Sequence, residues 1–123
     1  MDCIFCKIIK GEIPSYTVYE DDVVKVFLDV NPSSNGHMLI VPKEHTVDLD
    51  TIEENVLLHV MRTAKQMKHL LEEKLHVDGV ALLQNNGIAQ EVKHYHLHIK
   101  PCYKIKQELL PVEQIYQTLK ESL

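Results

Sequence analysis

Residues 94–100, His94-Tyr95-His96-Leu97-His98-Ile99-Lys100, alternate polar side chains with apolar or aromatic ones. In a β-strand, successive side chains point to opposite faces of the sheet. The alternation therefore predicts a strand over residues 94–100, stopped by Pro101, with three imidazoles on one face. The other side chains of this strand are expected to pack against a helix.

The segments around this strand predict an α+β fold. Apolar runs bounded by turn residues predict strands over residues 17–20, 23–28, 37–41 and 80–83. From residue 51 to about residue 75, apolar side chains recur at three- and four-residue steps, which predicts one long helix. Thr51-Ile52-Glu53-Glu54 offers a capping pattern at its start. Short helices are predicted before Gly11 and after Pro111. The expected fold is a five-stranded antiparallel sheet with one long helix and short N- and C-terminal helices.

Length and composition limit the possible functions. The chain has 123 residues, which fits a single domain over residues 1–123. Its net charge is −5 without a basic run, so binding to a nucleic acid polymer is not expected. No apolar stretch is long enough for a membrane span, and the N-terminus lacks a signal-peptide pattern. Three cysteines do not form a closed disulfide framework, and the expected location is the cytoplasm.

The three histidines allow several interpretations. A solvated strand face could carry them by chance, or alternating histidines could share one Zn²⁺. Alternatively, a neutral imidazole could attack phosphorus as a nucleophile, with neighbouring imidazoles donating to the phosphate oxygens. Near the N-terminus, Cys3-x-x-Cys6 has the spacing of a metal half-site or a redox pair.

The sequence around these motifs resembles the histidine-triad (HIT) family. H-Y-H-L-H-I-K, residues 94–100, is similar to its signature His-φ-His-φ-His-φ-φ, with Lys100 where an apolar residue is usual. CIFCKIIKGEIPSYTVYEDD (3–22), FLDVNPSSNGHMLIVPKEH (27–45) and NNGIAQEVKHYHLH (85–98) resemble the HINT-type, nucleoside phosphoramidase branch in order and spacing. The resemblance implies a HIT-like fold, a purine nucleotide of the AMP type as ligand, and a homodimer.

The resemblance also implies a role for each histidine. His96 would be the nucleophile that forms a covalent nucleotidyl intermediate. His98 would contact the phosphate and help protonate the leaving group, with His37 assisting. The implied phosphate-side loop positions are Asn85, Ala89, Gln90 and Glu91, where Glu91 replaces the usual serine and its carboxylate would repel a phosphate. The implied nucleoside pocket comprises Ile4, Phe5, Ile8, Phe27, Asp29 and Val30, in which apolar side chains sandwich a purine and a carboxylate accepts from ribose hydroxyls.

Related bacterial proteins place zinc between a CxxC pair, a histidine after a proline, and the first histidine of the triad. Cys3, Cys6, His45 and His94 match that pattern here. The resemblance therefore implies a closed, structural Cys₂His₂ zinc site. Such a site would assign His94 to the metal and leave His96 and His98 for chemistry.

Three functions follow from these interpretations. The first is a nucleotide hydrolase or transferase that cleaves P–N or related bonds of adenosine nucleotides. The second is a dinucleoside polyphosphate hydrolase. The third is a regulatory purine-nucleotide-binding protein with little turnover.

Overall fold

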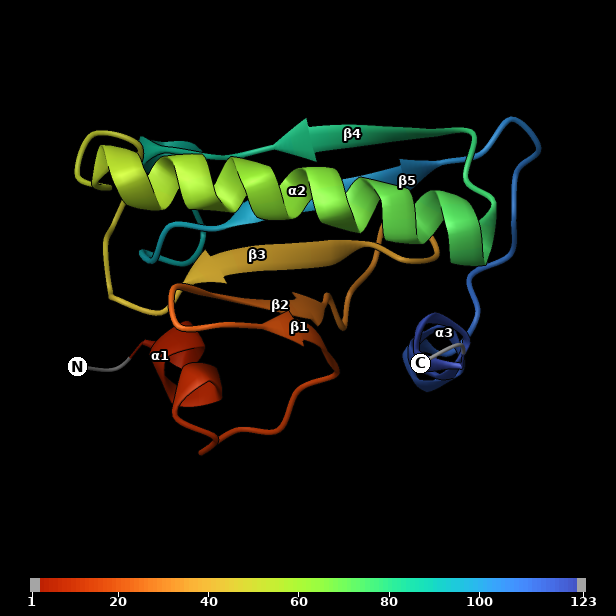
Figure 1. Cartoon of the computed structure of the whole chain (residues 1–123), viewed down its shortest axis with the longest axis horizontal. Helices are drawn as coiled ribbons and strands as arrows, with labels where there is room; N and C mark the ends of the chain where they lie inside the picture. The colour runs from red at the N-terminus through yellow and green to blue at the C-terminus, as the bar shows by residue number, and fades with distance from the viewer. Residues whose placement is uncertain (1–2, 122–123) are drawn as a thin grey trace.

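The computed structural model describes residues 3–121 of the chain. Within them, five strands form one antiparallel sheet in the order β1-β2-β3-β5-β4. The strands are β1 (Thr17–Glu20), β2 (Val24–Leu28), β3 (Met38–Pro42), β4 (Gly79–Leu83) and β5 (Leu97–Cys102). The helices are α1 (Ile4–Ile9), α2 (Glu54–Leu75), the 3₁₀ turn η1 (Gly87–Ala89) and α3 (Val112–Lys120). The predicted α+β architecture is confirmed (Figure 1).

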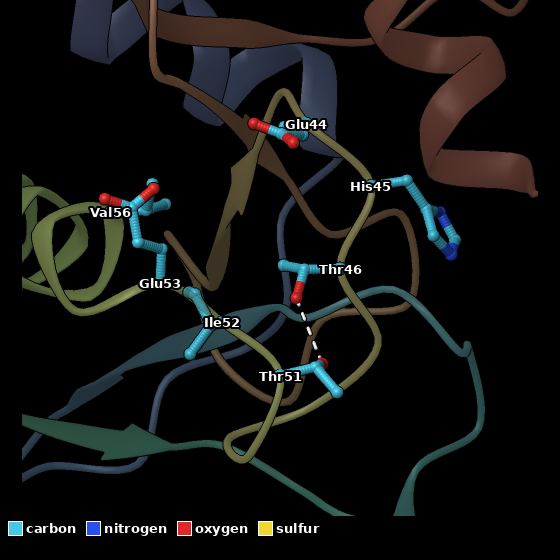
Figure 2. A pocket seen from close by; sticks show the side chains of 7 residues that line it. All are labelled: Glu44, His45, Thr46, Thr51, Ile52, Glu53 and Val56. Carbon is cyan, nitrogen blue, oxygen red and sulfur yellow. Dashed lines mark hydrogen bonds between the residues drawn. The ribbon is translucent and has the colours of Figure 1, made fainter.

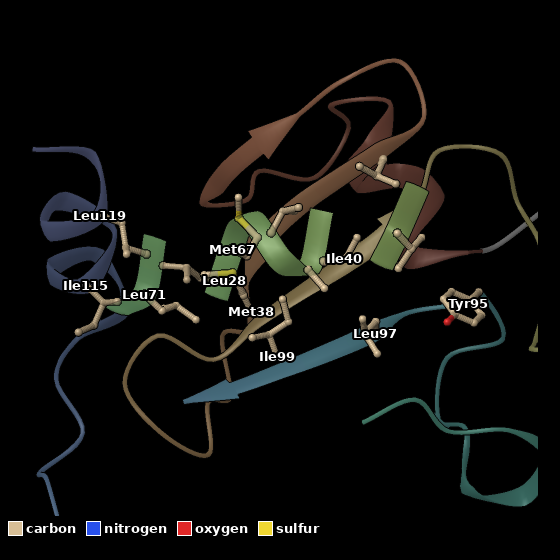
Figure 3. Close-up of a cluster of buried hydrophobic side chains, with 14 of the residues drawn as sticks. Leu28, Met38, Ile40, Met67, Leu71, Tyr95, Leu97, Ile99, Ile115 and Leu119 are labelled. Atoms are coloured by element: carbon tan, nitrogen blue, oxygen red, sulfur yellow. The ribbon is translucent and has the colours of Figure 1, made fainter. Parts of the chain in front are cut away.

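The two faces of the sheet are covered by different helices. The long helix α2 runs across one face (Figure 1), where alternate strand residues such as Val26, Met38 and Ile40 form the main core with α2 and α3 (Figure 3). The intervening residues Phe27 and Leu39 face the other way and form a second cluster with α1. Because both faces are covered, β2 and β3 are buried along their whole length.

The long helix begins later than the sequence predicts. It starts at Glu54, and its N-cap Glu53 makes no capping hydrogen bond through its side chain. Thr51 instead closes a turn, because its hydroxyl receives the N–H groups of Val47 and Asp48 at 3.2 and 3.1 Å. The hydroxyl that the capping pattern requires is therefore already engaged upstream. The predicted end at Leu75 is confirmed.

The histidine-bearing strand also differs from its prediction. β5 begins at Leu97, three residues later than expected, because His94 and Tyr95 turn toward the loop after β3. There, the Tyr95 N–H donates to the Thr46 carbonyl at 2.7 Å. Pro101 does not stop the strand but pairs with Val80 of β4. Since pairing with β3 ends at Ile99, the missing N–H of Pro101 removes no bond to that strand.

The turn between β1 and β2 is tied to the long helix through Asp21. Its carboxylate accepts the N–H groups of Val23 and Val24 at 2.8 and 2.9 Å. It also contacts the Tyr19 hydroxyl and His59 Nε2 of α2, both at 2.7 Å. Burial alone would raise the pKa of Asp21, but these hydrogen bonds outweigh it and lower the pKa well below its usual range.

β4 forms one edge of the sheet, and its side chains become more exposed toward Leu83. Among residues 3–121, no helix has the length and apolar character needed to cross a membrane.

Candidate active site and metal centre

The first histidine of the triad lies buried beside α1. His94 Nε2 lies 2.8 Å from the Pro42 carbonyl oxygen, which can only accept, so Nε2 carries the proton in this hydrogen bond. Nδ1 is thereby left as the acceptor atom and faces the two cysteines of the N-terminal motif. Burial lowers the pKa of His94, which keeps the imidazole in the neutral form that binds metals.

Two thiols and two imidazoles converge at this point. Cys3 Sγ and Cys6 Sγ lie 3.3 and 3.6 Å from His94 Nδ1, and Cys6 Sγ lies 3.3 Å from His45 Nδ1. All four potential ligand atoms lie within 4.8 Å of one another. This Cys₂His₂ donor set fits a tetrahedral zinc ion, and the Pro42 carbonyl fixes the tautomer of His94 as metal-ligating histidines require. Burial raises the pKa of the Cys6 thiol, so a bound cation would be what holds it as a thiolate.

Two local structures bring these ligands together. Cys3 is the N-cap of α1, and its Sγ accepts the Cys6 N–H at 3.4 Å, so the first turn of the helix points both sulfurs the same way. His45 lies in the loop after β3 and is one of the residues around the small cavity beside that loop (Figure 2). The Thr46 and Thr51 hydroxyls, 3.0 Å apart, brace this loop.

The second histidine is held with one nitrogen free. His96 Nδ1 lies 2.8 Å from the His94 carbonyl oxygen, so Nδ1–H donates to it and Nε2 keeps its lone pair. The Phe5 ring lies edge-on to His96, with the ring centroids 5.0 Å apart. The backbone of His94 therefore orients His96. His94 is also part of the thiol–imidazole cluster formed by Cys3, Cys6, His45 and His94.

The third histidine belongs to a separate hydrogen-bonded chain. The Ser33 N–H donates to His37 Nδ1 at 3.0 Å, so Nδ1 of a neutral His37 is unprotonated and Nε2 carries the proton. His37 Nε2 lies 3.0 Å from His98 Nδ1 and 3.5 Å from Asp29 Oδ2. If Nε2–H donates to His98, the remaining proton of His98 is on Nε2. This arrangement gives the site a nucleophilic nitrogen on His96 beside an N–H donor on His98.

Burial and nearby charges keep the hydrogen-bonded imidazoles of His37 and His98 neutral. Burial, together with the nearby basic groups His96, His37 and Lys100, lowers the pKa of His98 to about 4, and Asp29 opposes them. Burial also lowers the pKa of His37, although the Asp29 carboxylate opposes that effect. Neutral imidazoles are the form that can accept and donate in sequence near pH 7.

A cavity of about 360 Å³ opens in front of His96 and His98. Eight of the residues expected to bind nucleotide line it: Ile4, Phe5, Asp29, Asn85, Ala89, Glu91, His96 and His98. Four others lie elsewhere. Ile8 and Phe27 are buried behind Phe5, Val30 is exposed, and the Gln90 amide donates to the Val47 carbonyl oxygen.

The cavity also contains residues that the sequence did not single out for this purpose, namely Leu39, Leu83, Val92 and Lys100. Leu39 and Leu83 flank His98 on the neighbouring strands β3 and β4, so they follow from the register of the sheet. Lys100 follows from alternation along β5, two residues beyond His98 on the same face.

Comparison with known proteins places this arrangement in a family. The model of the HIT domain family matches residues 10–105, which is more than half of the chain. This chain belongs to the HIT family. The thiol–imidazole cluster extends beyond the matched region, because Cys3 and Cys6 precede residue 10.

Relatives in this family carry assigned activities. An adenosine 5'-monophosphoramidase of Saccharomyces cerevisiae is 46% identical over 110 residues, covering 88% of this chain and 67% of that protein. An adenylylsulfatase of Arabidopsis thaliana is 40% identical over 102 residues, covering 81% of this chain and 52% of that protein. A zinc-bound histidine triad family protein of Mycobacterium smegmatis has a similar solved structure, with a TM-score of 0.89 and 33% identity. That match covers 98% of this chain and 92% of that one. The relatives with assigned activities thus support nucleotide hydrolysis of the HIT-family type.

Proposed function

We propose that this protein hydrolyses P–N or related bonds of adenosine nucleotides through a covalent nucleotidyl intermediate on His96. The observation that carries the proposal is the orientation of His96, whose Nδ1–H is fixed by the His94 carbonyl at 2.8 Å. A neutral imidazole held in this tautomer presents an unprotonated Nε2 at the cavity that His98 also lines. The 46% identity to the yeast phosphoramidase supports the choice of substrate class.

In the first step, His96 Nε2 forms a bond to the α-phosphorus and the bond from phosphorus to the leaving nitrogen breaks. The leaving nitrogen takes up the Nε2 proton of His98 and departs as a neutral amine. The positive charge that the His96 ring acquires on nucleotidylation balances the negative charge left on the His98 ring. The Ser33 N–H donates to His37 Nδ1, which leaves the His37 proton on Nε2. His37 Nε2–H in turn occupies Nδ1 of His98, so the proton of His98 stays on Nε2, on the cavity side. In the second step, water attacks the nucleotidyl-His96, returns a proton to His98 and releases the nucleoside monophosphate.

The two ends of the cavity suit the two parts of such a ligand. Ile4, Phe5 and Leu39 provide an apolar surface for a purine at the α1 end. Asp29 Oδ1 accepts the Asn31 N–H at 2.8 Å, which orients its carboxylate to accept hydrogen bonds from ribose hydroxyls. Glu91 lines the cavity from an exposed loop position, where solvent screens its repulsion of a phosphate.

We further propose that Cys3, Cys6, His45 and His94 hold a structural zinc ion. A zinc ion bound there would link α1 and the loop after β3 to the segment that carries His96. These residues do not line the cavity in front of His96, so the proposed ion would orient the nucleophile rather than contact the substrate.

A homodimer is the third part of the proposal. β4 is an edge strand with Leu82 and Leu83 exposed, and Leu58 and Met61 are exposed on α2. Exposed apolar side chains on an unpaired edge favour pairing with a second copy. Sedimentation at several protein concentrations tests this directly, and a monomer at all of them would contradict it.

The covalent step is tested by stopping turnover of adenosine 5'-phosphoramidate with denaturant at alkaline pH and locating the adduct by mass spectrometry. Alkaline conditions are needed because the P–N bond of a nucleotidyl-histidine is hydrolysed in acid. We expect an added nucleotidyl group on the peptide that contains His96. We also expect His96→Ala to lose turnover by a factor of about 10⁴ or more while remaining folded. Full activity of that variant, or an adduct elsewhere, would rule out the proposed mechanism.

A further inference from the structure

Lys100 is a cation inside the cavity that the steps above do not use. It follows His98 by two residues on β5, and both side chains are half-buried, whereas the intervening Leu97, Ile99 and Pro101 are buried in the opposite direction. Both His98 and Lys100 line the cavity. His98 and Lys100 are therefore neighbours on one face of β5, about 6.5–7 Å apart. With His96, which lies just before the strand and lines the same cavity, they form a row of basic side chains.

The charge of Lys100 lacks a protein partner among residues 3–121. The lysines that form ion pairs in this part of the chain are Lys25, Lys43, Lys68 and Lys74. Glu91 and Asp29 line the same cavity, but neither lies within 4.0 Å of the Lys100 ammonium. Partial burial removes water from the ammonium group and costs free energy when no carboxylate pairs with it. An anionic ligand that binds the ammonium offsets this cost.

The position of Lys100 in the row indicates which part of a ligand it meets. The Phe5 ring packs against His96, so the apolar end of the cavity lies near the beginning of β5. Lys100 lies beyond His98, toward the other end of the strand. A nucleotide with its base near Phe5 and its α-phosphate at His96 and His98 would direct its leaving group toward Lys100.

We propose that Lys100 binds a second phosphate group on the leaving-group side, so that this protein prefers adenosine nucleotides with an anionic leaving group. The inference rests on the proposed nucleotide hydrolase function and narrows its substrate class. The positive charge of Lys100 contributes to the lowered pKa of both His37 and His98, which agrees with an ammonium close to these two imidazoles.

The test compares the binding of AMP with that of adenosine 5'-(α,β-methylene)diphosphate, which adds a second phosphate and cannot be cleaved at the bridge. Calorimetric titrations would use the wild-type protein, Lys100→Met and Lys100→Arg. Lys65→Met is the matched control, because Lys65 is exposed on α2 and has no part in the cavity. We expect Lys100→Met to weaken binding of the methylene diphosphate by about tenfold and that of AMP by less than about threefold. Lys100→Arg should restore most of the difference, and Lys65→Met should change neither affinity.

Equal weakening of both ligands in Lys100→Met would place Lys100 at the α-phosphate or ribose and overturn the inference. Unchanged affinity for both would also overturn it, because Lys100 would then touch neither ligand. Both of these results would leave the proposed function intact. If neither nucleotide binds the wild-type protein, the proposed function fails as well, so the two failures are distinguishable.

Discussion

The two ends of the histidine segment, residues 94–98, show how residues close together in the sequence acquire different chemistry. His94 lies among two thiols and a second imidazole in a buried cluster. His98, only four residues later, lies among His37, Asp29 and Lys100 at an open cavity. The donor atoms around each ring, rather than the ring itself, decide whether it is suited to bind metal or to move a proton.

His96 connects the two ends. Its Nδ1–H donates to the carbonyl of His94, while its ring lies 5.0 Å from that of His98. The position of the His96 ring therefore depends on the main chain of His94. The difference between the two ends predicts that substitutions at the first end change stability and metal content, and that those at the second change turnover.

The largest effect is expected from Cys3→Ser at the buried end. Loss of a thiolate ligand should lower the zinc content well below one ion per chain and reduce the free energy of unfolding by about 3 kcal/mol or more. Elemental analysis of protein purified without chelators, together with denaturant unfolding, measures both. Cys102→Ser is the matched control, since Cys102 is exposed and outside the cluster. Wild-type stability and zinc content in Cys3→Ser would contradict the metal site.

The next effect concerns protonation at the open end. Because burial lowers the pKa of His98 to about 4, the folded protein excludes a proton that the unfolded chain binds near pH 6.5. His98 therefore contributes stability above pH 6.5 that is progressively lost as the pH falls toward 4. NMR titration of the His98 ring should give a midpoint near 4. A His98 midpoint near 6.5 would show that the cavity is more solvated than the structure indicates.

His37→Phe tests the hydrogen-bonded chain behind His98. Without His37 Nε2–H the tautomer and position of His98 are no longer fixed, so kcat should fall by about 10- to 100-fold with little change in zinc content. His69→Phe provides the control at an exposed position of α2. A loss of zinc in His37→Phe would show that the two ends are not independent.

The smallest effect is expected at Asp21, which belongs to neither end. Asp21→Asn removes the charge that accepts the Val23 and Val24 N–H groups and pairs with His59, and should cost about 1.5 kcal/mol of stability at pH 7. Because the pKa of Asp21 is lowered on folding, its contribution is present above pH 4 and is lost as the pH falls further. Unfolding at pH 7 and pH 3 should show this difference against Asp22→Asn, an exposed neighbour. Altered turnover in Asp21→Asn would mean that this ion pair also influences the site.

Much of the fold follows from patterns along the chain. The periodicity of residues 51–75 predicts α2, and alternation predicts the strands, because each pattern reflects which face of an element is buried. The predicted start of α2 is wrong, because nothing in the local pattern shows that the Thr51 hydroxyl accepts the N–H groups of Val47 and Asp48. The predicted start of β5 is wrong for a similar reason. The Tyr95 N–H donates to the carbonyl of Thr46, which is distant in the sequence, so no local pattern shows this hydrogen bond.

The sequence alone determined the chemical groups available: alternating histidines, a CxxC pair, Asp29 and Lys100, together with the register that places His96, His98 and Lys100 on one face. The tertiary structure decided how those groups are paired. Only folding brings Cys3 within 3.3 Å of His94, 91 residues away, and His37 within 3.0 Å of His98. Hydrogen-bond partners and burial set the tautomer and pKa of an imidazole, and both depend on residues far along the chain, so periodicity cannot specify them.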